Sequence, residues 1–388
     1  MANRDEASVI EVVDALVRDA IVRSASDIHV ESTSSGARVR YRVDGVLFDK
    51  VMIPKPLMLQ VISRFKILAN INIAEKRIPQ DGKFRAAVDG NEIDLRVSTF
   101  PSINGEKVVV RILDRSKNMI NLDSLGFSET MFKTFNDLVQ KSSGFFLVTG
   151  PTGSGKTTTL YAALSCLNTP EKNIITLEDP VEYNLDGITQ GQIHPDAGFT
   201  FGKGIRSVLR QDPDVAMVGE IRDRETAQTA IEAALTGHSV FSTLHTNDAP
   251  GALMRLMDMG IEPFLINAAL TGVLAQRLAR KICDDCRTEV APTQQEKDLL
   301  SQFGTSVQKL YTGKGCDSCF GLGYKGRVGI FELLTMTSDL RSLVVHRPVF
   351  DDIRTQAQKD GMTSLLDDGL HKVKNGLISL QELARVVL

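Results

Sequence analysis

Residues 150–157 read Gly-Pro-Thr-Gly-Ser-Gly-Lys-Thr, and this segment decides the fold of the chain. It fits the Walker A pattern, in which a glycine-rich loop points backbone N–H groups at the phosphates of a nucleotide. The apolar run Phe145–Thr149 precedes the loop and the helix-forming segment Thr158–Leu167 follows it, as the pattern requires. An ordinary glycine-rich turn is the alternative, but the agreement of the loop with both flanks favours a nucleotide site.

Two side chains of the loop have roles of their own in this pattern. Lys156 would reach the β- and γ-phosphates, and the hydroxyl of Thr157 would bind Mg²⁺. The glycines let the backbone come close to the phosphates at the positive end of the following helix. We therefore expect ATP and Mg²⁺ to bind, with nucleotide-binding residues Gly150, Pro151, Thr152, Gly153, Ser154, Gly155, Lys156, Thr157 and Thr158.

Short apolar runs and helical segments alternate on the C-terminal side of the loop. Ile174–Leu177, Val215–Val218 and Val240–Thr243 are runs of the kind that a parallel sheet buries on both faces. Between them, Arg224–Thr236 is predicted to be a helix with Asp223 as its N-cap. This order predicts an α/β core around the loop.

Carboxylates stand at the ends of two of these predicted strands. Glu220 and Glu178 would both reach the carboxyl edge of the sheet, where open α/β sheets bind ligands. Each could instead be an ordinary solvated loop acid, and their shared position at the edge favours a catalytic role. His238 and His245 bracket a third strand. They could sense the γ-phosphate or be structural, and the spacing does not decide between the two.

The first 114 residues show a different pattern. Residues 37–43 alternate strictly, with Val39, Tyr41 and Val43 on one face and arginines on the other, as in a half-buried strand. We expect a small α+β domain over 1–114, followed by a polar linker over 115–121. Its further strands are predicted at Phe84–Val88, Ile93–Ser98 and Lys107–Leu113.

Four of the five cysteines form two Cys-x-x-Cys pairs. The pairs are Cys283 with Cys286 and Cys316 with Cys319, and 29 residues separate them. Four thiolates at such spacing typically hold a structural zinc ion, whereas a redox motif needs one pair at the start of a helix. We therefore predict a zinc site. Cys166 lies in the helix after the Walker A loop and is expected to be a small buried residue.

Composition excludes several classes of protein. Lys and Arg number 45 against 48 Asp and Glu, so no bulk positive charge favours nonspecific nucleic-acid binding. The first residues are charged and lack the apolar stretch of a secretory signal. The longest weakly polar stretch, Phe264–Ala275, is too short to span a bilayer. We expect a cytoplasmic protein that reaches a membrane only through partner proteins.

Taken together, the motifs resemble those of the secretion ATPase superfamily, and specifically the assembly ATPases of type II secretion and type IV pili (GspE/PilB). In that family the matching blocks are called the Walker A motif, the aspartate box, the Walker B motif and the histidine box. They correspond here to 150–157, Leu177–Glu182, Arg210–Asp223 and Leu235–Asn247.

The resemblance implies roles for individual residues. Glu220 would bind Mg²⁺ and activate water, with Glu178 as its helper. Arg96 and Arg111, from the small domain, would reach the γ-phosphate when that domain closes over the nucleotide. Lys156 and His245 complete the predicted catalytic set, and Arg206 and Arg210 match family positions that contact either the nucleotide or a neighbouring subunit.

The resemblance also implies an assembly and a machine. The family works as a homo-hexamer that drives pilin-like subunits into a filament, with an inner-membrane platform and cytoplasmic recruitment proteins as partners. The four-cysteine module marks assembly ATPases and argues against a pilus retraction motor. Members often carry a further N-terminal domain, which this sequence either lacks or has lost. A nucleic-acid motor is the alternative, although no basic or aromatic groove supports it.

The sequence thus predicts an α/β protein with a RecA-like P-loop ATPase core over 122–280. The small α+β domain precedes this core. An inserted zinc subdomain over 281–329 and a C-terminal helical subdomain over 330–388 follow it.

Overall fold

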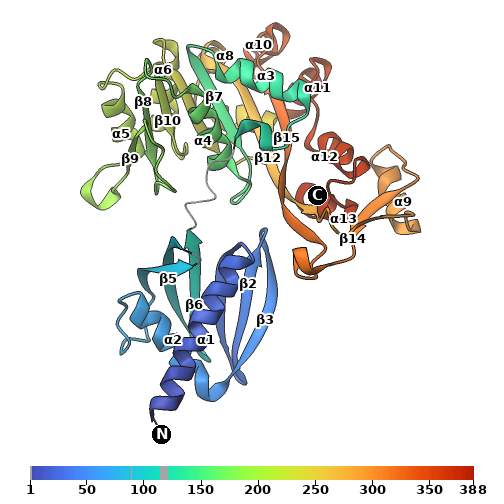
Figure 1. Ribbon diagram of the computed structural model, residues 1–388. Helices are drawn as coiled ribbons and strands as arrows, with labels where there is room; N and C mark the ends of the chain where they lie inside the picture. Colours follow the sequence, from blue (N-terminus) through green and yellow to red (C-terminus); the bar gives the residue numbers. More distant parts are fainter. Residues whose placement is uncertain (1, 89, 114–120) are drawn as a thin grey trace. The chain divides into compact units, whose positions relative to one another are not determined.

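The computed structural model describes residues 2–88, 90–113 and 121–388, and the chain forms two compact units (Figure 1). Unit 1 comprises Met1–Met119 and unit 2 comprises Ile120–Leu388. The linker predicted at 115–121 lies outside the described residues except for its last position.

Unit 1 is a six-stranded antiparallel sheet in the order β3-β2-β1-β6-β5-β4. Helices α1 (Ala2–Val22) and α2 (Lys55–Leu68) pack on one face of the sheet and contact each other. The other face remains open within the unit. The strands are β1 Ala25–Thr33, β2 Gly36–Val43, β3 Val46–Pro54, β4 Gln80–Val88, β5 Asn91–Ser102 and β6 Gly105–Leu113.

The two faces of this sheet differ because polar and apolar side chains alternate along its strands. In β2, Val39 and Tyr41 are buried under the helices. The Tyr41 hydroxyl donates a hydrogen bond of 2.9 Å to the carbonyl oxygen of Leu16 in α1. The predicted alternation is confirmed, and the open face receives the arginines of the strand, which are Arg38, Arg40 and Arg42.

Unit 2 contains a seven-stranded sheet in the order β15-β12-β7-β11-β10-β8-β9. Every neighbouring pair is parallel except β12 and β15. The buried strands expected from the sequence are confirmed as β7, β8, β10 and β11. The bounds are β7 Gly144–Thr149, β8 Ile174–Glu178, β9 Thr189–Gln192, β10 Val215–Val218, β11 Ser239–Leu244, β12 Leu270–Ile282 and β15 Tyr324–Thr335.

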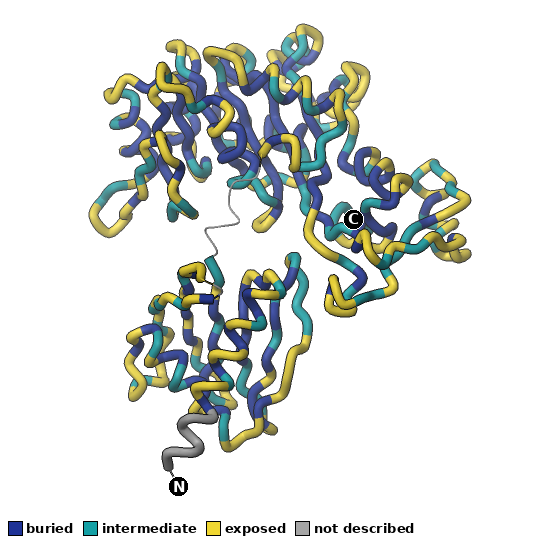
Figure 2. Tube along the Cα trace, viewed as in Figure 1, coloured by how far each residue is buried: buried dark blue, intermediate teal, exposed yellow. Residues whose placement is uncertain are grey.

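Helices cover both faces of this sheet, and its strands β7, β8, β10 and β11 are almost wholly buried (Figure 2). Apolar side chains of α3 and α4 pack on one face, and those of α5 to α8 pack on the other. This is the layered α/β arrangement that was predicted. The helices are α3 Glu129–Val139, α4 Lys156–Leu167, α5 Phe201–Val208, α6 Arg224–Leu235, α7 Ala249–Asp258 and α8 Pro263–Ala269.

Strands β12 and β15 form a long antiparallel ribbon that leaves the sheet and carries the cysteine module at its far end. The boundary expected at 329/330 falls inside β15. The apolar run Val328–Leu334 is compatible with a buried strand or a helix, and pairing with β12 makes it a strand. The module adds β13 Arg287–Val290, α9 Gln294–Gln302 and β14 Leu310–Gly313. The chain then ends in α10 Ser338–Val344, α11 Phe350–Lys359, α12 Leu365–Lys374 and α13 Leu380–Val387.

Side-chain caps fix the starts of α6 and α13, and the first of these was predicted. Asp223 accepts a hydrogen bond from the backbone N–H of Thr226, as expected of an N-cap. Ser379 likewise accepts from the N–H of Glu382, but the Glu382 carboxylate binds the backbone and guanidinium of Arg280 in β12. Ser379 and Glu382 have the spacing of a capping box, but only the Ser379 half forms, because Arg280 competes for the carboxylate.

Candidate nucleotide site and cysteine cluster

The Walker A loop runs from the end of β7 to the first turn of α4. Gly150 has a φ of 148°, and a Cβ there would lie 2.5 Å from the carbonyl oxygen of Gln276. Gly155 caps α4 with a φ of 89°. Both positions need glycine, since other residues rarely adopt these angles and the first leaves no room for a side chain.

Lys156 lies folded back over this loop. Its Nζ donates hydrogen bonds of 2.8 Å to the carbonyl oxygen of Gly150 and 3.1 Å to that of Pro151. Burial lowers the pKa of Lys156, the charge of Glu220 opposes this effect, and the charge of Arg277 adds to it. A bound phosphate would offer the ammonium group full negative charge in place of two carbonyl dipoles.

Gln276, in the middle of β12, holds the Walker A loop and the first turn of α4 through its side-chain amide. Its Nε2 donates to the carbonyl oxygen of Ser154 at 2.7 Å, and its Oε1 accepts from the hydroxyl of Thr159 at 2.8 Å. The residue is 1% exposed, so these bonds form away from water. Sequence reasoning missed Gln276. Its place directly after the apolar run Val273–Ala275 shows a change of polarity, but its two partners are known only from the fold.

Two polar contacts tie the loop strand to the segment after β11. The hydroxyl of Thr149 bonds the carbonyl oxygen of Leu244 at 3.1 Å and accepts from the N–H of Thr246 at 2.9 Å. Arg277 in turn donates to the carbonyl oxygen of Asn247 at 2.8 Å. The histidine-box segment is therefore bonded directly to the end of the Walker A strand.

Glu220 lies after β10 at the centre of a small charged cluster. Its Oε2 is 3.4 Å from Nε2 of His245, and its Oε1 accepts a hydrogen bond from Arg222. Arg222 is also 3.6 Å from the carboxylate of Asp179, and the hydrogen bond with Glu220 raises the pKa of Arg222. The structure thus brings together Glu220 and His245 of the predicted set and adds Arg222.

Glu178 has a different environment. It is 3% exposed, and its two oxygens accept hydrogen bonds from Tyr161, from Thr176 at 2.5 Å and from Gln190 at 3.1 Å. Burial and the bond to this carboxylate raise the pKa of Tyr161. Through these bonds Glu178, at the end of β8, is joined to α4 and β9. It makes no bond to the Glu220 cluster.

The two histidines of the histidine box lie at opposite ends of β11. His238 precedes the strand, and its Nδ1 is 3.0 Å from the carbonyl oxygen of Ala233 at the end of α6. Only His245 reaches the carboxyl edge of the sheet, so His238 cannot share a site with it.

The family-matched arginines of α5 and its C-terminus bind partners in unit 2. Arg206 forms an ion pair with Glu225 of α6. Arg210 donates to the carbonyl oxygen of Arg206 at 2.8 Å and to the hydroxyl of Ser207 at 3.1 Å. These contacts hold α5 and its C-terminus in place.

Arg96 and Arg111 both lie on the open face of the unit 1 sheet. They stand directly opposite each other in β5 and β6. Arg96 is exposed, and the side chain of Arg111 is 65% exposed. Two cations in such a pair repel each other, and an anion between them would relieve the repulsion.

The four predicted metal-ligating cysteines are brought together in space. Their Sγ atoms all lie within 4.8 Å of one another, with Cys283–Cys316 and Cys286–Cys319 distances of 3.8 Å and a Cys316–Cys319 distance of 3.7 Å. Four thiolates arranged tetrahedrally around zinc at ~2.3 Å would be about 3.8 Å apart. Backbone N–H groups also donate to two of the sulfurs, at 3.2 to 3.3 Å. The cluster fits a tetrahedral metal ion.

Cys166 differs from the prediction. It is exposed on α4, not buried, because the apolar face of that helix is formed by neighbours such as Leu164 and Leu167. It lies outside the cysteine cluster.

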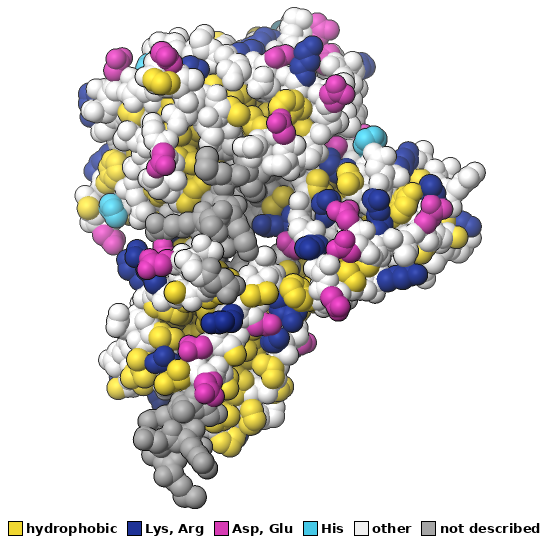
Figure 3. All heavy atoms as spheres, in the orientation of Figure 1, with side chains coloured by type: hydrophobic (Ala, Val, Ile, Leu, Met, Phe, Trp, Pro, Cys, Tyr) yellow, Lys and Arg dark blue, Asp and Glu magenta, His cyan; other side chains and the backbone are white. Residues whose placement is uncertain are grey.

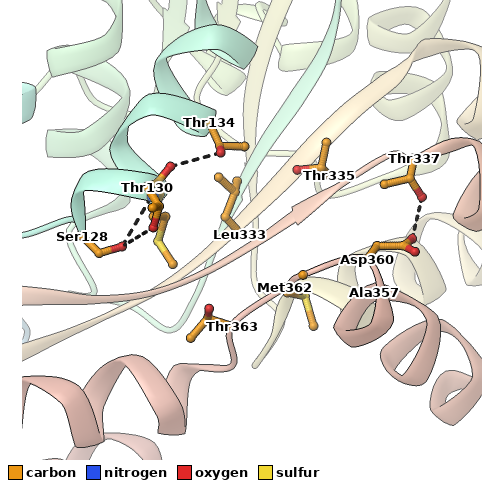
Figure 4. Close-up of a pocket in the computed structure, with 12 residues that line it drawn as sticks. Ser128, Thr130, Thr134, Leu333, Thr335, Thr337, Ala357, Asp360, Met362 and Thr363 are labelled. Carbon is orange, nitrogen blue, oxygen red and sulfur yellow. Dashed lines mark hydrogen bonds between the residues drawn. The ribbon is translucent and has the colours of Figure 1, made fainter.

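A cavity of about 170 Å³ lies elsewhere in unit 2, between α3, β15 and the α10–α11 region (Figure 4). Hydroxyl groups line much of it. The hydroxyl of Ser128 caps α3, and that of Thr337 caps α10 and donates to Asp360 at 2.6 Å. None of the predicted site residues lines this cavity.

Comparison with known proteins places these features in a family. The family model described as "Type II/IV secretion system protein" matches residues 2–385. The chain belongs to this family. It is 48% identical over 386 residues to a type II secretion system protein E of Pseudomonas aeruginosa, covering 100% of this chain and 77% of that protein. It is 46% identical to the type IV pilus assembly ATPase PilB of Thermus thermophilus, covering 99% of this chain and 43% of that protein.

Solved structures agree with this assignment. The pilus retraction motor PilT with bound ADP matches with a TM-score of 0.62 and 25% identity, over 96% of each chain. The ATPase DotB of Legionella pneumophila matches in fold with a TM-score of 0.68. The chain is therefore an ATPase of the type II/IV secretion family, and the predicted fold class is confirmed.

Proposed function

We propose that this ATPase is a motor that couples ATP hydrolysis to the assembly of pilin-like filaments, in a type II secretion system or a type IV pilus. The observation that carries the proposal is the cluster of Glu220, Arg222 and His245 at the sheet edge that also bears the Walker A loop. The chain is also 46% identical over 386 residues to the type II secretion system ATPase E of Vibrio cholerae, covering 100% of this chain and 76% of that protein.

In the proposed mechanism, residues 150–158 hold ATP and Thr157 binds Mg²⁺. Glu220 orients the attacking water and helps bind the metal ion. Its hydrogen bond to Arg222 orients the carboxylate, and His245, 3.4 Å away, would couple it to the γ-phosphate. Glu178 supports this site by holding α4, whose first turn contains Lys156 and Thr157.

Arg96 and Arg111 complete the proposed chemistry. Arginine at a phosphoryl-transfer site stabilises the charge that develops on the γ-phosphate. The two opposed arginines of unit 1 would bind an anion between them. We propose that this anion is the γ-phosphate of ATP bound to unit 2. Hydrolysis would then depend on the arrangement of the two units and drive motion between them.

The assembly and its partners are also proposals. We infer a homo-hexamer in the cytoplasm that docks on an inner-membrane platform through recruitment proteins, with zinc in the cysteine cluster. No helix in the described parts of the chain combines the length and apolarity needed to cross a membrane.

The test combines genetics with turnover. Deleting the gene in the source organism should abolish either exoprotein secretion or surface pili, and the phenotype that is lost identifies the machine. Complementation with Glu220→Gln should fail, and the purified variant should hydrolyse ATP ~10²-fold more slowly or worse while still binding it. Full complementation by this variant would contradict the proposal.

A nucleic-acid motor is the competing function, and a separate experiment tests it. On the face drawn in Figure 3, Lys and Arg side chains are interspersed with Asp and Glu. Such mixing does not favour a phosphate backbone. Strong stimulation of the ATPase by single-stranded DNA, lost at high salt, would support the competing function instead.

A further inference from the structure

The open face of the unit 1 sheet carries one row of charged side chains across five strands. The register places Lys83, Arg96, Arg111, Asp27 and Arg42 opposite one another from β4 to β2. Four of these five are cations, and like charges directly opposite one another destabilise a sheet. Asp27 is the single carboxylate of the row, so its contacts decide which cation is neutralised.

Asp27 is fixed in place by three neighbours. Its Oδ1 accepts a hydrogen bond of 3.2 Å from Nε of Arg111. Its Oδ2 accepts from the hydroxyl of Ser26 at 2.8 Å and lies 3.6 Å from Nε of Arg42. The Asp27 side chain is 10% exposed and that of Arg111 is 65% exposed. A buried carboxylate therefore anchors an arginine whose outer end is in solvent.

The nitrogen atom through which Asp27 holds Arg111 determines which nitrogens of the guanidinium stay free to bind a ligand. Asp27 uses Nε and leaves the two terminal nitrogens, which form the fork that binds phosphate oxygens in pairs. Among the side chains that the structure describes, which are those of residues 9–88, 90–113 and 121–388, no acidic group pairs with these terminal nitrogens. The contact orients the guanidinium without occupying its phosphate-binding edge.

We propose that Asp27 is a positioning residue for ATP hydrolysis, which holds the Arg111 fork ready for the γ-phosphate. The inference rests on the proposed role of Arg111 and goes beyond it. Preorganisation of this kind removes the cost of ordering a long side chain in the transition state. Asp27 itself does not touch the nucleotide.

The same strand offers a matched control, Glu31. It lies four residues further along β1, on the same face, and its Oε1 accepts hydrogen bonds of 2.8 Å from Arg40 and from Lys107. Burial raises the pKa of Glu31, but the two hydrogen bonds have the larger combined effect and lower this pKa from 4.5 to about 2. Glu31 thus has the same structural role as Asp27, with no contact to Arg111.

The experiment measures ATP turnover and binding of a fluorescent ATP analogue by the full chain. The variants are Asp27→Asn, Arg111→Ala, the double variant and Glu31→Gln, each with its melting temperature. Asp27→Asn should lower kcat ~10- to 100-fold with an unchanged dissociation constant. It should have no further effect in the Arg111→Ala background. Glu31→Gln should lose thermal stability while keeping kcat.

The outcomes separate the two proposals. If Arg111→Ala leaves kcat unchanged, the proposed role of Arg111 fails and the inference falls with it. If Arg111→Ala lowers kcat but Asp27→Asn does not, or the two effects multiply, only the inference is overturned. Should Asp27→Asn fail to fold, Ser26→Ala removes one support of the carboxylate. It should give a smaller loss of kcat that also disappears in the Arg111→Ala background, and an unchanged kcat would overturn the inference.

Discussion

Gln276 shows how much of the nucleotide loop depends on one side chain outside it. Its amide holds Ser154 and Thr159, and substitution by Leu would leave the Ser154 carbonyl oxygen and the Thr159 hydroxyl buried without this partner. We expect Gln276→Leu to cost about 1–3 kcal/mol of stability and to raise the KM for ATP roughly tenfold. Steady-state kinetics of ATP hydrolysis would measure the KM, and urea unfolding would measure the stability.

The control for this variant is Gln228→Leu. Gln228 bonds only Glu232 in its own helix, at 2.8 Å. It should change neither quantity measurably. An unchanged KM in Gln276→Leu would show that the loop keeps its shape without this anchor.

The residues of the site divide into those that a local pattern reveals and those that it does not. The Walker A loop and the position of Glu220 at the sheet edge could be predicted because both follow from spacing within one segment. The roles of Gln276 and Arg222 could not, since they depend on contacts with distant segments: Gln276 bonds Ser154, 122 residues away, and Arg222 joins Asp179 to Glu220. The pattern at Glu178 indicated an edge carboxylate but not its burial against Tyr161.

Among the elements, the last helix is bound to the sheet by a buried ionic contact. Glu382 is 1% exposed and accepts hydrogen bonds from Arg280 and Arg385. Burial raises the pKa of Glu382, but these arginines lower it from 4.5 to about 2. Because the folded-state pKa is the lower one, the contact stabilises unit 2 fully above pH 4.5 and loses its contribution as the pH falls toward 2.

The pKa difference makes a prediction about acid stability. Replacing Glu382 with Gln should cost about 3 kcal/mol at pH 7, and the difference from wild type should shrink steadily between pH 4.5 and 2. Denaturant unfolding across that range is the measurement. Glu289→Gln, which breaks an exposed pair with Lys309, should show almost no difference at any pH. A pH-independent cost for Glu382→Gln would exclude the ionic explanation.

Some strands of unit 2 could be predicted from the sequence and one could not. The short buried strands β7, β8, β10 and β11 could be recognised because apolar runs of that length are bounded by turns and helices. Strand β15 could not be recognised, since its place in the sheet depends on pairing with β12 rather than on any local signal.

At the scale of the whole molecule, the β12–β15 ribbon connects the nucleotide loop with the cysteine cluster. Gln276 and Cys283 are seven residues apart on the path of one strand, or roughly 23 Å. Metal at Cys283 would therefore stabilise the far end of an element whose near end anchors the loop.

Metal analysis tests this connection. The purified protein should contain one zinc per chain, and Cys283→Ser should lower both the metal content and the melting temperature. Cys166→Ser should change neither, because that residue is exposed and outside the cluster. Less than half an equivalent of metal after chelator-free purification would count against zinc.

The central claim is that hydrolysis at the Walker A loop requires arginines from the other unit. The most direct test is the kcat of Arg96→Ala and Arg111→Ala at saturating Mg-ATP, with nucleotide affinity measured separately. We predict a loss of ~10²- to 10³-fold in kcat for each variant with ATP still bound. Wild-type turnover in both variants would contradict the claim.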